Sequence, residues 1–406
     1  MEQNKNQNRG RVGLRRSLGL GAVILLLGSA TVHRLADAAT GTVEQSMAAV
    51  RAASHVDPVA ASGAGVDVAV IDTGVVPTRF LQGDRLIYGP DFSADALKPS
   101  LQDLDAFGHG TNVASIVAGM ASAARVVSVK VAAADGSTTP ARLAAAVGWV
   151  ALNAHTGGRN IRVLNFSYGI PPGPEGTALI VALRAAWAAG IVVVASAGND
   201  GVGFTIDAPA SDSWFVAVGA AKAGGTNVVP ADFSSSTYVS RSVDVIALGV
   251  DIVGARVPGS FLDQMFPEAR SGDDGFRGSG TSQASAVVSG IAAGLIGRAP
   301  RLTADQVKAL LRDSARFVFG YTPAVQGRGV VDQQTALARS APVAWWASVL
   351  NGTLVPLPPL PSLGELVKPL DGSAWNGPEW SGNRWSGGAW QGNRWSGNRW
   401  SGSRWE

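Results

Sequence analysis

Between residues 66 and 338, short apolar runs alternate with stretches of helical periodicity. In the latter, apolar residues recur three and four positions apart, as at Val113, Ile116, Val117 and Met120. The apolar runs are bounded by turn residues and cover positions 66–71, 126–131, 161–166, 191–195, 215–218 and 243–247. Strands that are apolar throughout are typical of a mostly parallel sheet that helices cover on both faces. We therefore predict an α/β fold of three layers, with functional residues at the carboxyl ends of the strands.

Three helices are predicted with defined positions. Residues 43–53 have the pattern of an amphipathic helix. Residues 283–296 have the pattern of a second helix, which is more apolar. Thr303 and Gln306 have the spacing of a capping box and precede the apolar residues of a last helix.

Composition excludes several classes of protein. The 406-residue chain has no cysteine, which excludes a disulfide scaffold, a thiolate zinc site, an iron–sulfur cluster and a cysteine nucleophile. Its net charge is +3, but residues 1–38 hold six basic and two acidic side chains and contribute +4 of it. The remainder is close to neutral, so we expect no surface for nucleic acid.

Residues 1–38 have the pattern of a secretory signal peptide. Basic residues precede an uncharged run from Ser17 to Val32, and Ala36-Asp37-Ala38 follows as a cleavage site of small residues. The alternative is an uncleaved membrane anchor, but the run is shorter than the roughly 20 residues that a spanning helix needs. Two adjacent arginines would also suit a twin-arginine signal, although any basic leader can contain them. We therefore expect a secreted protein, and the absence of cysteine in it indicates a bacterial one.

Two further segments follow the domain predicted at residues 61–340. Residues 341–373 are rich in Pro and Leu, which predicts a stiff linker. In residues 374–406 a tryptophan stands at every fifth position from Trp375 to Trp405, a period that fits neither a helix face nor a strand face. This tail is either a disordered low-complexity segment or a multivalent surface whose indole rings stack on cell-wall sugars. We expect contact with cell wall or polysaccharide through the tail, and otherwise a monomer.

Candidate catalytic residues stand at strand ends and helix starts. Asp72 ends the first apolar strand in Asp-Thr-Gly, His109 lies between two glycines before a helix, and Ser282 precedes the helix predicted at 283–296. Taken singly, they have simpler explanations as a turn former, a helix-entry residue and an N-cap. Asp-Thr-Gly also suits an aspartic protease, but that mechanism needs two carboxylates and the sequence has no second such motif.

The order of these three residues along the chain favours a catalytic role over the simpler explanations. Asp72, His109 and Ser282 are separated by 37 and then 173 residues, and Asp–His–Ser is the order of subtilisin. Two further motifs lie at residues 165–169, Asn-Phe-Ser-Tyr-Gly, and at residues 197–201, Ala-Gly-Asn-Asp-Gly. On these five motifs the chain resembles the subtilisin-like serine proteases, or subtilases, from about residue 60 to residue 338.

The resemblance implies a role for each catalytic residue. Ser282 would attack the scissile carbonyl of a polypeptide and form an acyl-enzyme, and His109 would carry the proton from Ser282 to the leaving amine. Asp72 would orient the imidazole of His109. The side-chain amide of Asn199, with the backbone N–H of Ser282, would bind the oxyanion.

The resemblance also implies a substrate cleft. One wall would be an edge strand that pairs with extended substrate, formed by Ser167, Tyr168 and Gly169. The opposite wall of the primary specificity pocket would be formed by Ser196, Ala197 and Gly198. Their small size indicates room for a mid-sized or large apolar side chain. The chemistry requires no metal or other cofactor; structural calcium is frequent in the family, but no acidic loop here has a spacing that identifies a site.

Several positions depart from the family pattern. Asn112 stands where many members have a second histidine, and Gln283-Ala284-Ser285-Ala286 replaces the usual Met-Ala-(Ala/Ser)-Pro. Residues 39–60 are also too short for the folding propeptide domain with which subtilases are commonly made. None of these changes removes a proton-transfer group. They leave one alternative open, an inactive or weak subtilase that binds cell wall through its tryptophan tail.

The assignment of His109 as general base predicts a loss of activity in acid. An imidazole accepts a proton only in its neutral form, and histidine in general changes charge near pH 6.5. Hydrolysis of a peptide substrate, followed at a series of pH values, should therefore decline below roughly pH 6–7. A flat profile between about pH 5 and pH 8 would count against this base.

Overall fold

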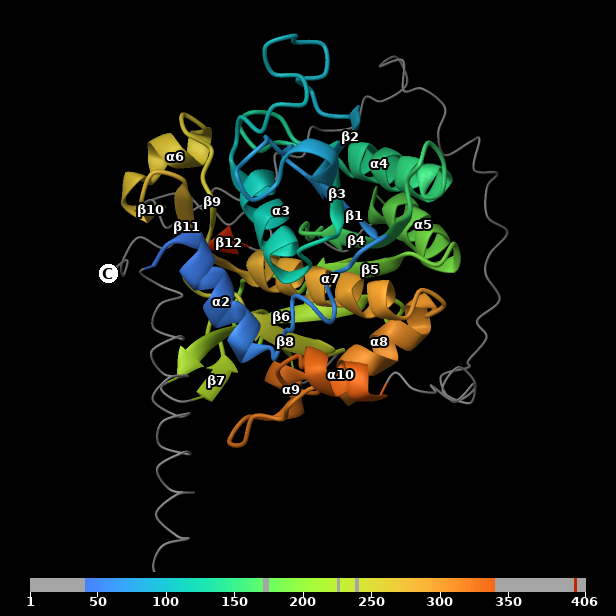
Figure 1. Cartoon of the computed structure of the whole chain (residues 1–406), viewed down its shortest axis with the longest axis vertical. Coiled ribbons are helices and arrows are strands. Elements are labelled where there is room, and N and C mark those ends of the chain that lie inside the picture. Colours follow the sequence, from blue (N-terminus) through green and yellow to red (C-terminus); the bar gives the residue numbers. More distant parts are fainter. Residues whose placement is uncertain (1–40, 171–174, 225–226, 238–240, 340–397, 400–406) are drawn as a thin grey trace, which may run out of the picture.

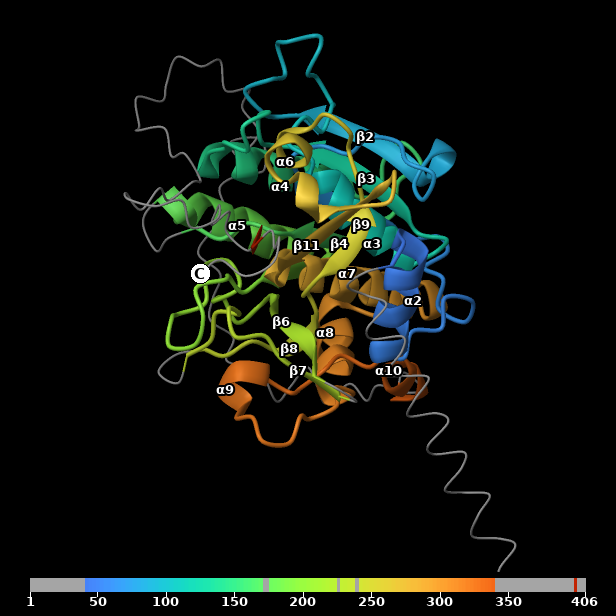
Figure 2. The same ribbon diagram turned by 90° about the vertical axis from the view of Figure 1, so that its left-hand side faces the viewer.

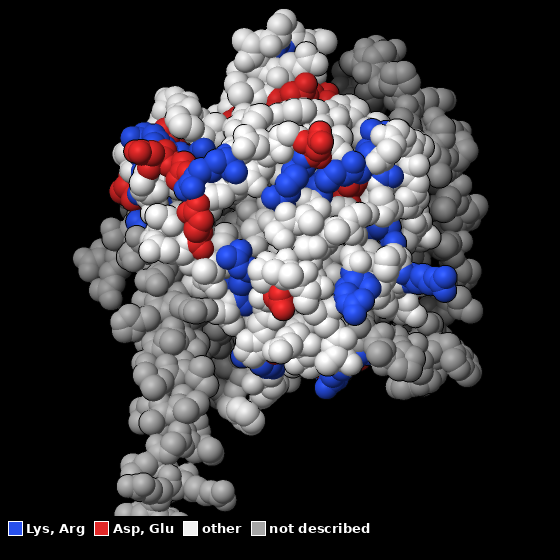
Figure 3. All heavy atoms as spheres, in the orientation of Figure 1, with Lys and Arg blue, Asp and Glu red and all other residues white. Residues whose placement is uncertain are grey.

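The computed structural model describes residues 41–170, 175–224, 227–237, 241–339 and 398–399. The predicted signal peptide and linker lie outside these residues, as does the tryptophan tail apart from residues 398–399. Within the described ranges, no helix is long and apolar enough to cross a membrane. On the face shown in Figure 3, basic and acidic side chains are interspersed over a mostly uncharged surface.

A sheet of eight strands forms the middle layer of the described chain (Figure 1). The strands run in the order β2-β3-β1-β4-β5-β6-β7, and β8 pairs with β6. All pairs are parallel except that of β6 with β7. The strands are β1 (Asp67–Asp72), β2 (Leu86–Asp91), β3 (Arg125–Lys130), β4 (Ile161–Phe166), β5 (Val192–Ser196), β6 (Val216–Gly224), β7 (Asn227–Pro230) and β8 (Val245–Leu248). The six predicted apolar runs correspond to β1, β3, β4, β5, the first part of β6 and β8.

Helices cover both faces of this sheet, which confirms the predicted three-layer α/β fold (Figure 2). On one face α4 (Pro140–Asn153) packs against α5 (Glu175–Ala188), and on the other α3 (His109–Met120) packs against α7 (Thr281–Arg298). All residues of β1 and β5 are buried, as continuous apolar strands between two helical layers require. The remaining helices are α2 (Val43–Ala53), α6 (Phe261–Met265), α8 (Ala304–Asp313), α9 (Pro323–Gln326) and α10 (Gln333–Arg339), with 3-10 turns at Gly83–Arg85 and Pro267–Ala269.

Two of these helices confirm predictions in detail. Helix α2 has the predicted bounds and starts with a capping box between Thr42 and Gln45. Helix α8 starts with the predicted capping box, in which Thr303 accepts from the backbone N–H of Gln306 and the Gln306 side chain accepts from Thr303 N–H.

A small second sheet leads into α7. Its central strand, β11 (Gly275–Gly280), pairs antiparallel with β9 (Ile252–Ala255), β10 (Arg270–Ser271) and β12 (Asn398–Arg399). Strand β11 ends at the residue before α7. In the register of β11 with β12, Ser279 faces Arg399 and Gly280 faces Asn398, so two residues of the tail region lie beside the start of α7.

Helix α7 is buried from Thr281 to Ile296, and small residues allow its neighbours to come close. A Cβ added at Gly290 would lie 2.4 Å from Met120 Cβ and 2.9 Å from the carbonyl oxygen of Val117. Glycine at this position therefore sets how closely α7 packs against α3.

We predict that Gly290→Ala destabilises the protein. Alanine gains about 1 kcal/mol of helix propensity over glycine, but the added methyl group must push two backbones apart, and the net loss should be about 2 kcal/mol. The matched control is Gly119→Ala in α3, where the added Cβ meets the flexible end of the Met47 side chain, at 2.7 Å from Sδ. Denaturant unfolding should show a lower midpoint for the first variant alone. Equal midpoints for the two variants would mean that α3 and α7 can move apart at little cost in folding free energy.

Candidate active site

Asp72 and His109 form a buried pair at one edge of the central sheet. Strand β1 ends at Asp72, and His109 is the first residue of α3. Asp72 Oδ1 and His109 Nδ1 are 2.6 Å apart, and both side chains are fully buried. Because β1 lies between β3 and β4, Asp72 stands at the topological switch point of the sheet, where α/β folds place their functional residues. A hydrogen bond from Nδ1 to a carboxylate sets the tautomer and orientation of the imidazole.

A second buried carboxylate, Asp105, joins the turn after Asp72 to the start of α3. Its Oδ1 accepts from Thr73 Oγ1 and from Gly108 N–H, each at 2.7 Å, and its Oδ2 accepts from Thr111 N–H at 2.8 Å. Burial raises the pKa of Asp105, and the hydrogen bonds from Thr111, Thr73 and Gly108 oppose that rise. The sequence analysis missed Asp105, whose position four residues before His109 is its only signal.

Two glycines allow this junction to form. Gly108, the N-cap of α3, has φ of 102°, a left-handed conformation that favours glycine. A Cβ at Gly110 would lie 2.1 Å from the carbonyl oxygen of Gly74 and 3.1 Å from Asp72 Cβ. The helix that carries His109 can therefore approach the Asp72 turn only because this residue has no side chain.

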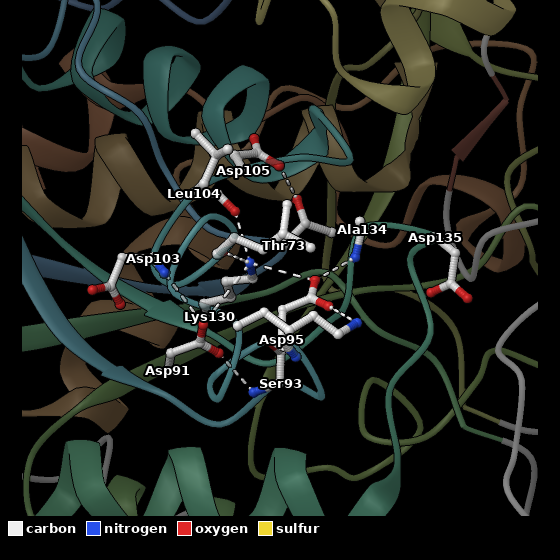
Figure 4. A network of polar contacts seen from close by, with 12 residues as sticks. Thr73, Asp91, Ser93, Asp95, Asp103, Leu104, Asp105, Lys130, Ala134 and Asp135 are labelled. Atoms are coloured by element: carbon white, nitrogen blue, oxygen red, sulfur yellow. Dashed lines mark hydrogen bonds and ion pairs between the residues drawn. The ribbon is translucent and has the colours of Figure 1, made fainter.

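The loop that precedes Asp105 is held by a buried lysine (Figure 4). Lys130, at the end of β3, donates from Nζ to the carbonyl oxygens of Leu101 and Leu104 at 2.7 and 2.8 Å. The carboxylates of Asp91 and Asp95 lie 3.9 and 3.7 Å from the same Nζ. Lys130 thus places a positive charge among these oxygens, and Lys98 adds a second one at 2.9 Å from Asp95 Oδ1. No group of three or more His, Asp or Glu residues in the described ranges could hold a metal ion.

Asn199 and Ser282 are brought together by Thr281. Asn199 Oδ1 accepts from Thr281 N–H at 3.0 Å and from Thr281 Oγ1 at 3.1 Å. The hydroxyl of Thr281 in turn accepts from Gly198 N–H at 3.2 Å. With Oδ1 anchored, Asn199 Nδ2 makes no hydrogen bond to a described residue, and neither does Ser282 Oγ. The site thus holds an available amide donor and a hydroxyl at the start of α7, where helix N–H groups lack partners within the helix.

Comparison with known proteins identifies the family to which this site belongs. The model of the subtilase family matches residues 63–339. The chain belongs to the subtilase family. It is 32% identical over 300 residues to the serine protease AprX of Bacillus subtilis, covering 68% of this chain and 67% of that protein. It is also 32% identical over 269 residues to subtilisin DY of Bacillus licheniformis, covering 62% of this chain and 84% of that one.

A solved structure extends the comparison to the fold. The crystal structure of a cold-adapted subtilisin-like serine proteinase superposes with a TM-score of 0.53 at 28% identity, over 67% of this chain and 88% of that one. The predicted resemblance is therefore confirmed, and the subtilase is a serine endopeptidase whose substrates are polypeptides.

In this subtilase the two segments expected to bind substrate follow neighbouring strands, β4 and β5. Ser167, Tyr168 and Gly169 come directly after β4, and Ser196, the last residue of β5, is followed by Ala197 and Gly198. The Tyr168 side chain is buried and its ring centroid lies 5.8 Å from that of Phe166. Burial, with the carboxylates of Asp72 and Asp105 adding to it, raises the Tyr168 pKa well above its ordinary value. The Tyr168 side chain thus belongs to the buried core behind Asp72 and Asp105.

The asparagine that replaces a common histidine has a structural contact. Asn112 is buried in α3, and its Nδ2 donates to the carbonyl oxygen of Phe276 in β11 at 2.9 Å. This bond ties the helix of His109 to the strand that leads to Ser282. The departure from the family pattern therefore supplies a contact between the two halves of the site.

We predict that Thr281→Val lowers kcat with little change in KM. The variant removes one of the two Thr281 donors that hold Asn199 Oδ1, so an amide that serves as oxyanion donor would be held less firmly, and the oxyanion exists only in the transition state. The loss should be roughly tenfold to a hundredfold, below the ~10²–10³ found when the corresponding asparagine of subtilisin is removed. Thr281→Ser keeps the hydroxyl and serves as control. Equal kcat in both variants would show that Asn199 needs no such anchor.

Proposed function

We propose that this subtilase is a secreted endopeptidase that uses Asp72, His109 and Ser282 as a catalytic triad, with Asn199 as an oxyanion donor. The 2.6 Å contact between Asp72 and His109 at the switch point carries this proposal. The start of α7 supports it, because Ser282 stands there beside the anchored amide of Asn199.

In this mechanism Ser282 Oγ bonds to the scissile carbonyl carbon while its proton passes to His109 Nε2. The carbonyl oxygen gains the negative charge and accepts hydrogen bonds from Asn199 Nδ2 and from the backbone N–H of Ser282. The C–N bond then breaks, and His109 returns the proton to the leaving amine. Water then attacks the carbonyl carbon of the acyl-enzyme while His109 takes its proton. The bond to Ser282 Oγ breaks, His109 returns the proton to Ser282, and the carboxylic acid product is released. Asp72 holds the imidazole in place and stabilises its charged form.

Two features of the sequence support an extracellular location. Residues 1–38 have the pattern of an export signal, and the tryptophan repeat from Trp375 to Trp405 suits contact with cell-wall polysaccharide. The repeat gives the chain a means to stay near the cell surface after export.

Labelling with a fluorophosphonate probe tests the proposal. The probe reacts with an activated serine, so mass spectrometry of peptides from the labelled wild type should place it on Ser282. Ser282→Ala should abolish labelling, and His109→Ala should reduce it strongly because the base is lost. Ser289→Ala is the matched control, since Ser289 lies farther along the same buried helix, where its hydroxyl donates to Asn165 Oδ1, and it should leave the label on Ser282 unchanged.

A folded wild-type protein that takes no label would contradict the catalytic proposal. If that protein and Ser282→Ala bound isolated cell wall equally well, the alternative would hold, namely an inactive subtilase that acts through its tryptophan tail.

A further inference from the structure

Asp207 lies against both walls of the pocket that the resemblance to subtilases implies for the substrate side chain before the scissile bond. A Cβ added at Gly169 would lie 2.5 Å from Asp207 Oδ2 and 2.8 Å from Asp207 Cβ. A Cβ added at Gly198 would lie 2.9 Å from the same Oδ2. One carboxylate oxygen therefore contacts the backbone of both walls, and the two glycines provide the space for it.

The backbone of the same segment bridges the two walls. Asp207 N–H donates to the carbonyl oxygen of Ala197 at 3.2 Å, on the wall that follows β5. The next residue, Ala208, accepts from Ile170 N–H at 2.8 Å, on the wall that follows β4. The segment of Asp207 is thus held by one backbone hydrogen bond to each wall. The backbone hydrogen bonds of residues 207 and 208 therefore fix where the Asp207 side chain starts.

A carboxylate in this place changes which substrate side chain fits. Asp207 is half-buried, so part of the residue remains exposed to solvent. An apolar side chain would displace water from the exposed part of the carboxylate and could form no hydrogen bond with it, which is unfavourable. A guanidinium or ammonium would instead form a charge-assisted hydrogen bond with it. In trypsin, whose fold is unrelated, an aspartate in the specificity pocket sets a preference of this kind.

We propose that Asp207 makes this enzyme selective for peptide bonds that follow arginine or lysine. The inference rests on the proposed function, because it takes Ser282 as nucleophile and residues 167–169 and 196–198 as the pocket walls. It replaces the apolar side chain that the small wall residues alone indicated. The sequence analysis passed over Asp207 because it lies in a loop without a motif, eight residues after Asn199.

The test compares peptide substrates that differ only in the residue before the scissile bond, namely Arg, Lys, Phe or Leu. For the wild type, kcat/KM with Arg or Lys should exceed that with Phe or Leu by about 10²-fold or more. Asp207→Asn keeps the shape of the side chain and removes its charge, so it should lower kcat/KM for Arg and Lys by about 10²-fold. Its kcat/KM for Phe and Leu should stay the same or rise. Asp232→Asn, at an exposed position, controls for the loss of one negative charge.

Labelling of the same proteins with the fluorophosphonate probe separates the two proposals. Label on Ser282 in both wild type and Asp207→Asn, with no preference for Arg or Lys in the wild type, would overturn the selectivity and leave the proposed function in place. No label on the folded wild type would overturn both. A preference for Arg and Lys that survives in Asp207→Asn would also overturn the role of Asp207.

Discussion

The packing of α3 against α7 is the constraint on which the site depends. His109 begins one helix and Ser282 stands in the first turn of the other, so the relative position of the two residues follows from how the helices meet. Gly290 permits that contact, since any side chain there would meet the backbone at Val117. Asn112 adds a hydrogen bond from α3 to the strand before α7. The proposed nucleophile and base, which must share a proton, are thereby placed by buried helices, on which sites are held more precisely than on loops.

Two buried carboxylates, Asp72 and Asp105, fix the position of His109 in different ways. Asp72 contacts the imidazole of His109 directly, whereas Asp105 fixes the backbone on either side of it through Thr73, Gly108 and Thr111. A buried carboxylate is costly unless it accepts hydrogen bonds, and Asp105 accepts three. The turn and the helix start therefore have one low-energy arrangement, in which the donors around Asp105 are satisfied together. That arrangement is the one that brings His109 to Asp72.

Apolar periodicity and short motifs predicted the parts of the molecule that depend on local sequence. The bounds of α2, the capping box of α8 and six strands of the sheet follow from patterns that lie within one element. Strand β11 was missed because it is rich in glycine and its order comes from pairing with β9. The hydrogen bonds of Asp105, the buried position of Lys130 and the placement of Asp207 each depend on segments distant in sequence. Residue type alone did not distinguish these from ordinary surface charges.

The proposed catalytic residues and the proposed selectivity residue depend on different parts of the fold. Asp72, His109 and Ser282 stand at the ends of buried elements whose packing tolerates little change. Asp207 lies in the loop after β5, where backbone hydrogen bonds of residues 207 and 208 reach Ala197 and Ile170. A substitution at this position changes the charge that a substrate meets without altering the contact between Asp72 and His109, or that between α3 and α7. One scaffold can therefore keep its chemistry while the bond that it cleaves varies with a single loop residue.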